Sequence, residues 1–108
     1  MTNDPVLSRI AAQIEARKQA NAENSYVAGL FAAGEDAILQ KVGEESIEFL
    51  LAAKSNDTKH LVAEAADVWF HMLVLMSHKG LGPDDILKEL NSREGVSGLA
   101  EYAARGND

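Results

Sequence analysis

The feature that most constrains this chain is a pair of acidic clusters inside apolar, helix-forming sequence between Lys41 and His71. The first cluster spans residues 44–48, the second spans residues 64–67, and fifteen residues separate the two nearest glutamates. Carboxylates three or four residues apart share one face of a helix. Carboxylates directed at one place repel one another unless a cation or protons intervene. The pattern therefore predicts a divalent metal ion held between two helices.

The acids within each cluster stand at helical spacing. Glu45 and Glu48 are three residues apart, and Glu44 precedes Glu48 by four. Glu64 and Asp67 are also three residues apart. If the two helices run antiparallel across a short loop, four or five carboxylates line one pocket. Hard oxygen ligands without a thiolate favour Mg²⁺ or Mn²⁺ over zinc.

A solvated acidic face is the alternative explanation, and it suffices for Glu44 taken alone. A solvated face explains Glu64 and Asp67 less well, because they interrupt an apolar segment. Burying a charge there costs free energy unless the charge is paired. A di-iron carboxylate centre also fits poorly, because it uses Glu-x-x-His pairs and neither cluster supplies the histidine. The residues favour metal and phosphate chemistry over redox iron.

Two neighbours of the acidic clusters keep alternative roles. His71 follows Asp67 by four residues, and it is either an ordinary hydrogen-bonded core histidine or a side chain that orients a carboxylate or contacts phosphate. Lys41 precedes Glu44 by three residues, and it forms either a weak surface ion pair or a contact to phosphate. The sequence favours the hydrogen-bonded core role for His71 and leaves the two roles of Lys41 open.

Helical periodicity runs through the chain and predicts an all-α bundle of four to five helices, in a single domain over residues 1–108. We expect the helices over residues 5–20, 26–33, 35–53, 58–79 and 83–93, with a last turn or two over 99–104. N-caps are expected at Asp4, at Ser25, and at Asp57 or Thr58.

The two helices that carry the acids also carry the expected apolar contacts. In the first of them these contacts are expected from Ile38, Val42, Ile47, Leu50 and Leu51. The second is the most apolar helix and should be central. Its expected core residues are Val62, Ala66, Trp69, Leu73 and Met76.

Composition excludes several classes of protein. With 108 residues, 46% of them hydrophobic, the chain suffices for one domain and is not wholly disordered. The net charge of −7 argues against nucleic-acid binding, which depends on a basic surface. No apolar run reaches the roughly 20 residues that cross a bilayer, and the sequence contains no cysteine. Residues 1–5 lack the basic start and apolar block that are typical of a signal peptide, so we expect none. We expect a cytoplasmic protein without nucleic-acid or membrane partners.

Motifs on both sides of the acidic clusters narrow the interpretation. Glu44-Glu45-x-x-Glu48 followed by Glu64-x-x-Asp67 is similar to the signature of the MazG-like, all-α nucleotide pyrophosphohydrolases. The segments that narrow it further are residues 25–31, 34–38, 41–45, 64–71 and 90–105. Together they resemble the phosphoribosyl-ATP pyrophosphohydrolases of histidine biosynthesis over nearly the whole chain. Gln40 and Tyr102 depart from that pattern, because relatives often carry lysine at both places.

The resemblance implies hydrolysis of phosphoribosyl-ATP to phosphoribosyl-AMP and pyrophosphate, the second step of histidine biosynthesis. It implies Mg²⁺ ligation by Glu45, Glu48, Glu64 and Asp67. Catalytic roles are expected for Glu44, Glu45 and Glu48. Which acid ligates and which acts as base stays open, with Glu44 the first choice to orient the attacking water.

Substrate contacts are expected at Lys41, Arg93 and Ser97, and ordinary packing of the tail is the alternative for the last two. Relatives assemble as dimers, and one copy offers few long helices to close the pocket. We therefore expect a homodimer, with residues 69–76 as a candidate interface and the active site near or across it.

Two other functions compete with this interpretation. One is a MazG-like house-cleaning diphosphatase that acts on ordinary or damaged nucleoside triphosphates. The other is a non-catalytic helical dimerisation module with an incidental acidic face, which predicts no dependence on Mg²⁺.

Overall fold

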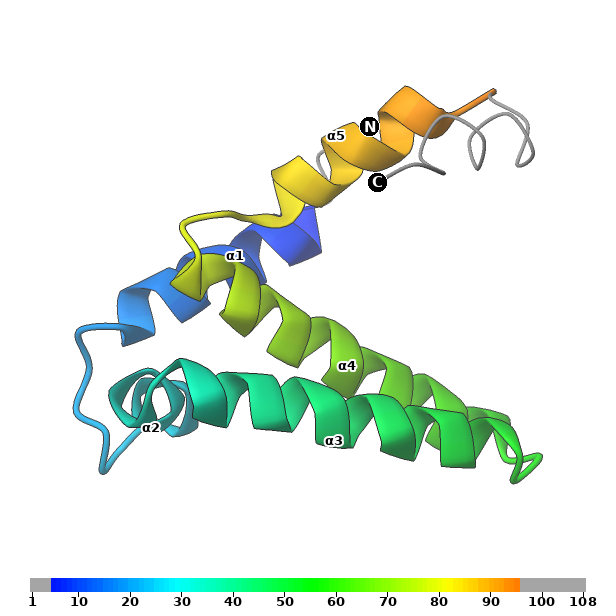
Figure 1. Cartoon of the computed structure of the whole chain (residues 1–108), viewed down its shortest axis with the longest axis horizontal. Coiled ribbons are helices and arrows are strands. Elements are labelled where there is room, and N and C mark those ends of the chain that lie inside the picture. The colour runs from blue at the N-terminus through cyan, green and yellow to red at the C-terminus, as the bar shows by residue number, and fades with distance from the viewer. Residues whose placement is uncertain (1–4, 96–108) are drawn as a thin grey trace.

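The chain folds into five helices in a computed structural model that describes residues 5–95 (Figure 1). The helices are α1 (Pro5–Arg17), α2 (Tyr26–Ala33), α3 (Glu35–Ala53), α4 (Thr58–His78) and α5 (Pro83–Arg93). The described residues contain no strand, so the all-α prediction is confirmed. Helix α1 ends three residues earlier than expected. The expected N-cap at Asp4 and the expected helical turn over 99–104 lie outside the described residues.

Local capping explains where the central helices begin. The Ser25 hydroxyl accepts a hydrogen bond from the Ala28 N–H at 3.1 Å, and the Asp57 carboxylate accepts one from the His60 N–H at 3.1 Å. These bonds satisfy N–H groups that a first helical turn leaves unpaired. Gly34 separates α2 from α3 with a φ of 105°, in the left-handed region that favours glycine. The chain therefore turns sharply there, and Figure 1 shows α2 nearly end-on while α3 lies lengthwise.

Helices α3 and α4 form a long antiparallel hairpin that positions the acidic residues (Figure 1). Helix α1 packs against α4, and α2 packs against α3, at the end of the hairpin that is remote from its loop. The buried core lies at that end. Its members are Ile14, Val27, Leu30, Ile38, Leu73 and Val74.

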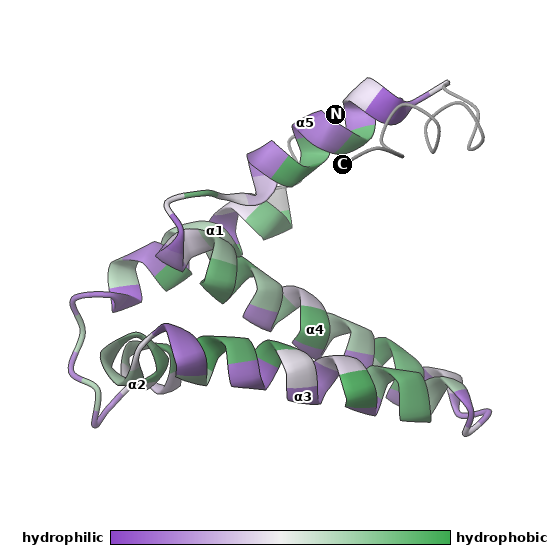
Figure 2. Cartoon of the chain, viewed as in Figure 1, coloured by the Kyte–Doolittle hydropathy of each residue, from purple (hydrophilic) through white to green (hydrophobic). Residues whose placement is uncertain are grey.

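The half of the hairpin nearest its loop exposes an apolar surface, and Figure 2 colours much of both helices there as hydrophobic. Val62 is 68% exposed and Trp69 is 57% exposed, and Ala66 is exposed as well. The prediction that these three residues belong to the core is wrong, whereas Leu73 is buried and Met76 is half-buried as expected. The other exposed members of this apolar surface are Ile47, Leu50 and Leu51. The physical reason is that α1 and α2 are too short to cover the whole hairpin.

Helix α5 lies apart from α3 and packs against α1 (Figure 1). Its start is fixed by the Asp85 carboxylate, which accepts a hydrogen bond from the Gly82 N–H at 2.9 Å. Within residues 5–95, no helix combines the length and the apolar character that a membrane span requires.

Candidate metal and active site

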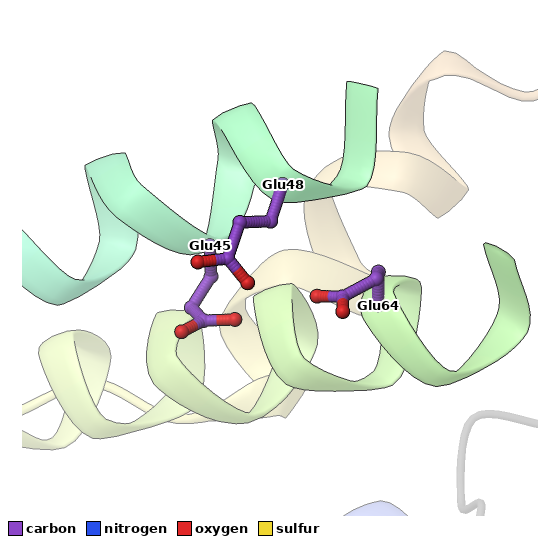
Figure 3. Close-up of side chains that lie close together, drawn as sticks. All are labelled: Glu45, Glu48 and Glu64. Carbon is purple, nitrogen blue, oxygen red and sulfur yellow. The ribbon is translucent and has the colours of Figure 1, made fainter. Parts of the chain in front are cut away.

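Three of the predicted acids meet between α3 and α4. Glu45 and Glu48 lie one turn apart on α3, and Glu64 faces them from α4 (Figure 3). Each offers a carboxylate oxygen, and these oxygens all lie within 4.8 Å of one another. Glu45 is buried, Glu64 is half-buried and Glu48 is exposed, so the group opens towards solvent on one side. The antiparallel pairing expected from the sequence is what brings them together.

One carboxylate oxygen of Glu64 lacks a hydrogen-bond partner in this group. Its Oε1 atom is buried and has no hydrogen-bond partner among the described residues. Its Oε2 atom lies 4.0 Å from His60 Nδ1. A buried polar atom without a partner costs about 1–3 kcal/mol, and more when it carries charge. A divalent cation bound by carboxylate oxygens would give this oxygen a partner. The residues present therefore fit an ion such as Mg²⁺ or Mn²⁺.

Asp67 stands at the edge of the group. It lies one turn after Glu64 on α4, is exposed, and is not one of the three clustered acids. Its backbone carbonyl accepts a hydrogen bond from His71 Nδ1 at 2.8 Å. Its role as a metal ligand stays a prediction.

Glu44 is not one of the three clustered acids, and its carboxylate has other partners. Its Oε2 accepts a hydrogen bond from Gln40 Nε2 at 2.9 Å, and its Oε1 lies 3.4 Å from Lys41 Nζ. These two partners, Gln40 first, hold the pKa of Glu44 below its usual value. Lys41 Nζ also lies 3.5 Å from Glu45 Oε2, so it links Glu44 to the clustered acids. The ion-pair role of Lys41 is therefore present, and its contact to phosphate stays a prediction.

Tyr26 is a neighbour of the site that the sequence reasoning did not assign a role. Its hydroxyl lies 2.7 Å from Nε2 of His71, which is buried. Burial raises the pKa of the Tyr26 phenol, and the charges of Lys41, Glu45 and Asp67 also act on it. The only signal in the sequence was the place of Tyr26 in the motif over residues 25–31. His71 is buried and hydrogen-bonded, as in the core role that the sequence favoured for it.

Of the two remaining predicted residues, Arg93 is described by the structure, and it is not among the residues gathered at the acids. Arg93 ends α5, and its Nε donates a hydrogen bond to Glu89 Oε2 at 3.0 Å. Figure 1 shows that end of α5 well away from the hairpin. Ser97 lies outside the described residues. Their substrate contacts stay predictions.

A helical hairpin that gathers carboxylates around one point, with a lysine at the rim, defines a class of all-α proteins suited to metal-assisted chemistry on phosphates. Within that class, the chain belongs to the phosphoribosyl-ATP pyrophosphohydrolase family, whose profile matches residues 7–94. This membership confirms the resemblance carried by the sequence motifs, and it identifies the chain as a hydrolase.

Curated relatives match nearly the whole chain. A phosphoribosyl-ATP pyrophosphatase of Methylibium petroleiphilum is 55% identical over 105 residues, which cover 97% of this chain and 88% of the relative. One of Chromobacterium violaceum is 55% identical over 105 residues, covering 97% and 96%. One of an Azoarcus species is 50% identical over 107 residues, covering 99% and 100%.

Proposed function

We propose that this chain hydrolyses phosphoribosyl-ATP to phosphoribosyl-AMP and pyrophosphate in histidine biosynthesis, with a divalent ion bound at the hairpin. The observation that carries the proposal is the meeting of Glu45, Glu48 and Glu64 within 4.8 Å, with one oxygen of Glu64 buried and unpartnered. The names of the relatives support the substrate. We assign Mg²⁺ as the ion, with Mn²⁺ as its substitute, because all the candidate ligands are carboxylates.

The four proposed ligands are Glu45, Glu48, Glu64 and Asp67. The first three are already close together, so little reorganisation precedes binding. Asp67 extends the same face of α4 by one turn. The bound ion supplies positive charge that offsets the phosphates and the leaving pyrophosphate.

The other charged residues act on water and on the substrate. Glu44 is a carboxylate at neutral pH, as an ordinary glutamate is, and it accepts a hydrogen bond from the attacking water. Lys41 brings a positive charge to the rim, where it contacts a phosphate oxygen. Arg93 and Ser97 contact the phosphoribosyl end of the substrate. In an assembly, α5 from a second copy offers a route for Arg93 to reach the site.

Pyrophosphate release from purified protein and phosphoribosyl-ATP tests the reaction. We expect release with Mg²⁺, loss of release when a chelator is added, and recovery when excess Mg²⁺ is restored. Equal or faster turnover of dATP and dCTP would assign the chain to the house-cleaning diphosphatases instead. Hydrolysis that persists in the chelator, or none with any of these nucleotides, contradicts the proposal.

We further propose a cytoplasmic homodimer, joined through the apolar surface near the hairpin loop. The segment over residues 69–76 is less suited to an interface than expected, because Leu73 and Val74 are buried in the core of this chain. The support is a set of large apolar side chains exposed together on α3 and α4, among them Leu51 at 63% and Val62 at 68%. Apolar surface of this extent usually marks an interaction site. Membership of a biosynthetic enzyme family supports the cytoplasmic location.

Sedimentation equilibrium at micromolar concentration tests the dimer. The wild-type chain is expected at twice the monomer mass, and Leu51→Asp or Val62→Asp is expected to shift it towards the monomer. Leu81→Asp, at a leucine outside this surface, is the matched control and is expected to remain dimeric. A wild-type monomer contradicts the proposed assembly.

A further inference from the structure

A groove of about 350 Å³ lies between α1, the start of α2 and α4. Its apolar lining includes Ile10 and Ile14 of α1 and Phe70 of α4, and polar side chains line it as well. Small-molecule clefts measure roughly 300 to 1,000 Å³ and combine apolar walls with a few polar groups that orient the ligand. The groove therefore has the size and the mixed lining that a small ligand requires.

Three polar side chains of this groove are uncommitted. Gln13 and Arg17 lie on α1, and Asn24 lies in the loop before α2. None of these side chains forms a hydrogen bond or an ion pair with another residue of the described chain. An amide offers both a donor and an acceptor to the edge of a heterocyclic base. A guanidinium group offers a fork of donors that matches phosphate oxygens.

A second groove, between α1, α4 and α5, provides a contrast. It measures about 170 Å³, and every described residue that lines it is apolar, Trp69 and Leu90 among them. Its lining cannot orient a polar molecule or balance the charge of a phosphate. Of the two grooves, the first is therefore the one that suits a nucleotide.

The first groove adjoins the acidic site through His71. The rings of Tyr26 and Phe70, which both line the groove, meet the His71 ring edge to face, with centroids 5.7 and 5.4 Å from it. His71 Nδ1 lies 2.8 Å from the backbone carbonyl of Asp67, one turn after Glu64 on α4. A ligand whose phosphates lie at the acids therefore reaches the groove by extending past His71.

The proposed substrate has the length and the charges for this arrangement. Phosphoribosyl-ATP carries a triphosphate on one ribose and a single phosphate on the other, with the purine between them. We propose that the groove binds the purine and the phosphoribosyl group, and that Arg17 binds the single phosphate. Arg17 then distinguishes this substrate from ATP, which has no phosphate at that end. The inference rests on the proposed function, and this contact adds to the one proposed for Arg93.

A solvated cation at the end of α1 is the competing role for Arg17, because positive charge there is favourable to the helix dipole. That role predicts that Arg17→Gln affects stability and treats all nucleotides alike. A phosphate contact predicts a loss confined to nucleotides that carry the phosphoribosyl group. Kinetics and binding therefore separate the two roles.

The kinetic test measures pyrophosphate release from phosphoribosyl-ATP with Mg²⁺. We expect Arg17→Gln to raise KM about tenfold or more and to keep kcat within about twofold. The reason is that the single phosphate does not react, so its contact is the same in the ground state and the transition state. Arg9→Gln, at an exposed arginine of α1 outside the groove lining, is the matched control and is expected to leave both constants unchanged. An unchanged KM in Arg17→Gln overturns the inference.

Binding without metal separates failure of this inference from failure of the proposed function. Titration calorimetry in a chelator compares phosphoribosyl-AMP with AMP, which lacks the single phosphate on a second ribose. The wild type is expected to prefer phosphoribosyl-AMP about tenfold or more, and Arg17→Gln is expected to bind the two alike. A wild type without this preference overturns the inference even if it hydrolyses phosphoribosyl-ATP. A preference that Arg17→Gln loses, in a wild type without turnover, supports the groove and overturns only the proposed function.

Methyl NMR spectra of the full chain test where the purine binds. Ile10 lines the first groove and Ile86 lines the second, and both are half-buried. Added phosphoribosyl-AMP is expected to shift the methyl signals of Ile10 through the ring current of the purine and to leave those of Ile86 in place. A shift at Ile86 alone, or at neither residue, overturns the inference.

Discussion

Two clusters of polar side chains involve α4, and they differ in whether their buried polar atoms have hydrogen-bond partners. Between α1 and the end of α4, the Ser77 hydroxyl donates to Glu15 Oε1 at 2.8 Å, and Lys18 Nζ donates to the Ser77 carbonyl at 2.8 Å. Lys18 also pairs with Glu15 at 3.3 Å. Between α3 and α4, Glu45, Glu48 and Glu64 converge, and a buried oxygen of Glu64 has no partner in the described chain.

The difference separates a cluster that stabilises the fold from a cluster that is prepared for a ligand. The first contains its own cation and its own donors, so the chain completes it without help. The second gathers like charges that repel one another, with Lys41 as a cation at its edge. Such local conflicts with folding stability are expected at functional sites. The following substitutions test that distinction.

The largest expected effect is on hydrolysis in Glu64→Gln. Loss of one carboxylate from the ion site is expected to lower kcat by about a thousandfold or more, as losses of transition-state charge stabilisation do. The melting temperature of the metal-free protein is expected to hold or rise, because repulsion is relieved. Asp36→Asn, at an exposed acid in the first turn of the same α3, is the control and is expected to keep kcat within about twofold. A Glu64→Gln enzyme with wild-type turnover would assign the cluster no catalytic role.

An intermediate effect is expected from Ser77→Ala in the closed cluster. Removal of the buried hydroxyl breaks its hydrogen bond to Glu15 and is expected to lower the free energy of unfolding by about 1–2 kcal/mol. Pyrophosphate release is expected to stay within about twofold of wild type, because this cluster serves the fold. Urea unfolding and the hydrolysis assay measure the two quantities. A Ser77→Ala protein of wild-type stability and impaired turnover would reverse the assignment.

The smallest effect concerns the pH dependence of the closed cluster. The hydrogen bond from Ser77, followed by that from Lys18, holds the pKa of Glu15 below its usual value of 4.5. A lowered folded-state pKa contributes stability that is present above 4.5 and is lost as the pH falls towards the folded-state value. Glu15→Gln is therefore expected to show a smaller decline in melting temperature than wild type between about pH 5 and about pH 3. Parallel declines in the two proteins would show that Glu15 does not contribute.

Most of the local structure could be predicted from the sequence, because its causes are local. Ser25 and Asp57 cap helices as expected, and Gly34 and Gly82 separate them. The spacing of the acids fixed their helical faces, and the short loop over residues 54–57 made the antiparallel pairing of α3 and α4 predictable. The family motifs supplied the substrate class, which the acids alone do not specify.

The burial of residues along the hairpin could not be predicted from the sequence, because it depends on how far the neighbouring helices extend over α3 and α4. Periodicity indicated an apolar face at Val62 and Trp69, and α1 and α2 leave that face uncovered. The sequence pattern is the same for an apolar helix face that packs against a second copy and for one that packs in the core of a monomer. Their difference appears only when the neighbouring helices are in place.

The sequence by itself determined that this chain is helical, that its acids lie on two helical faces, and to which family it belongs. Only the tertiary structure decided that Glu45, Glu48 and Glu64 converge while Glu44 turns to Gln40 and Lys41. Successive residues on a helix point about 100° apart. Adjacent glutamates therefore face different surroundings, and the packing of α4 against α3 selects which of them enters the site.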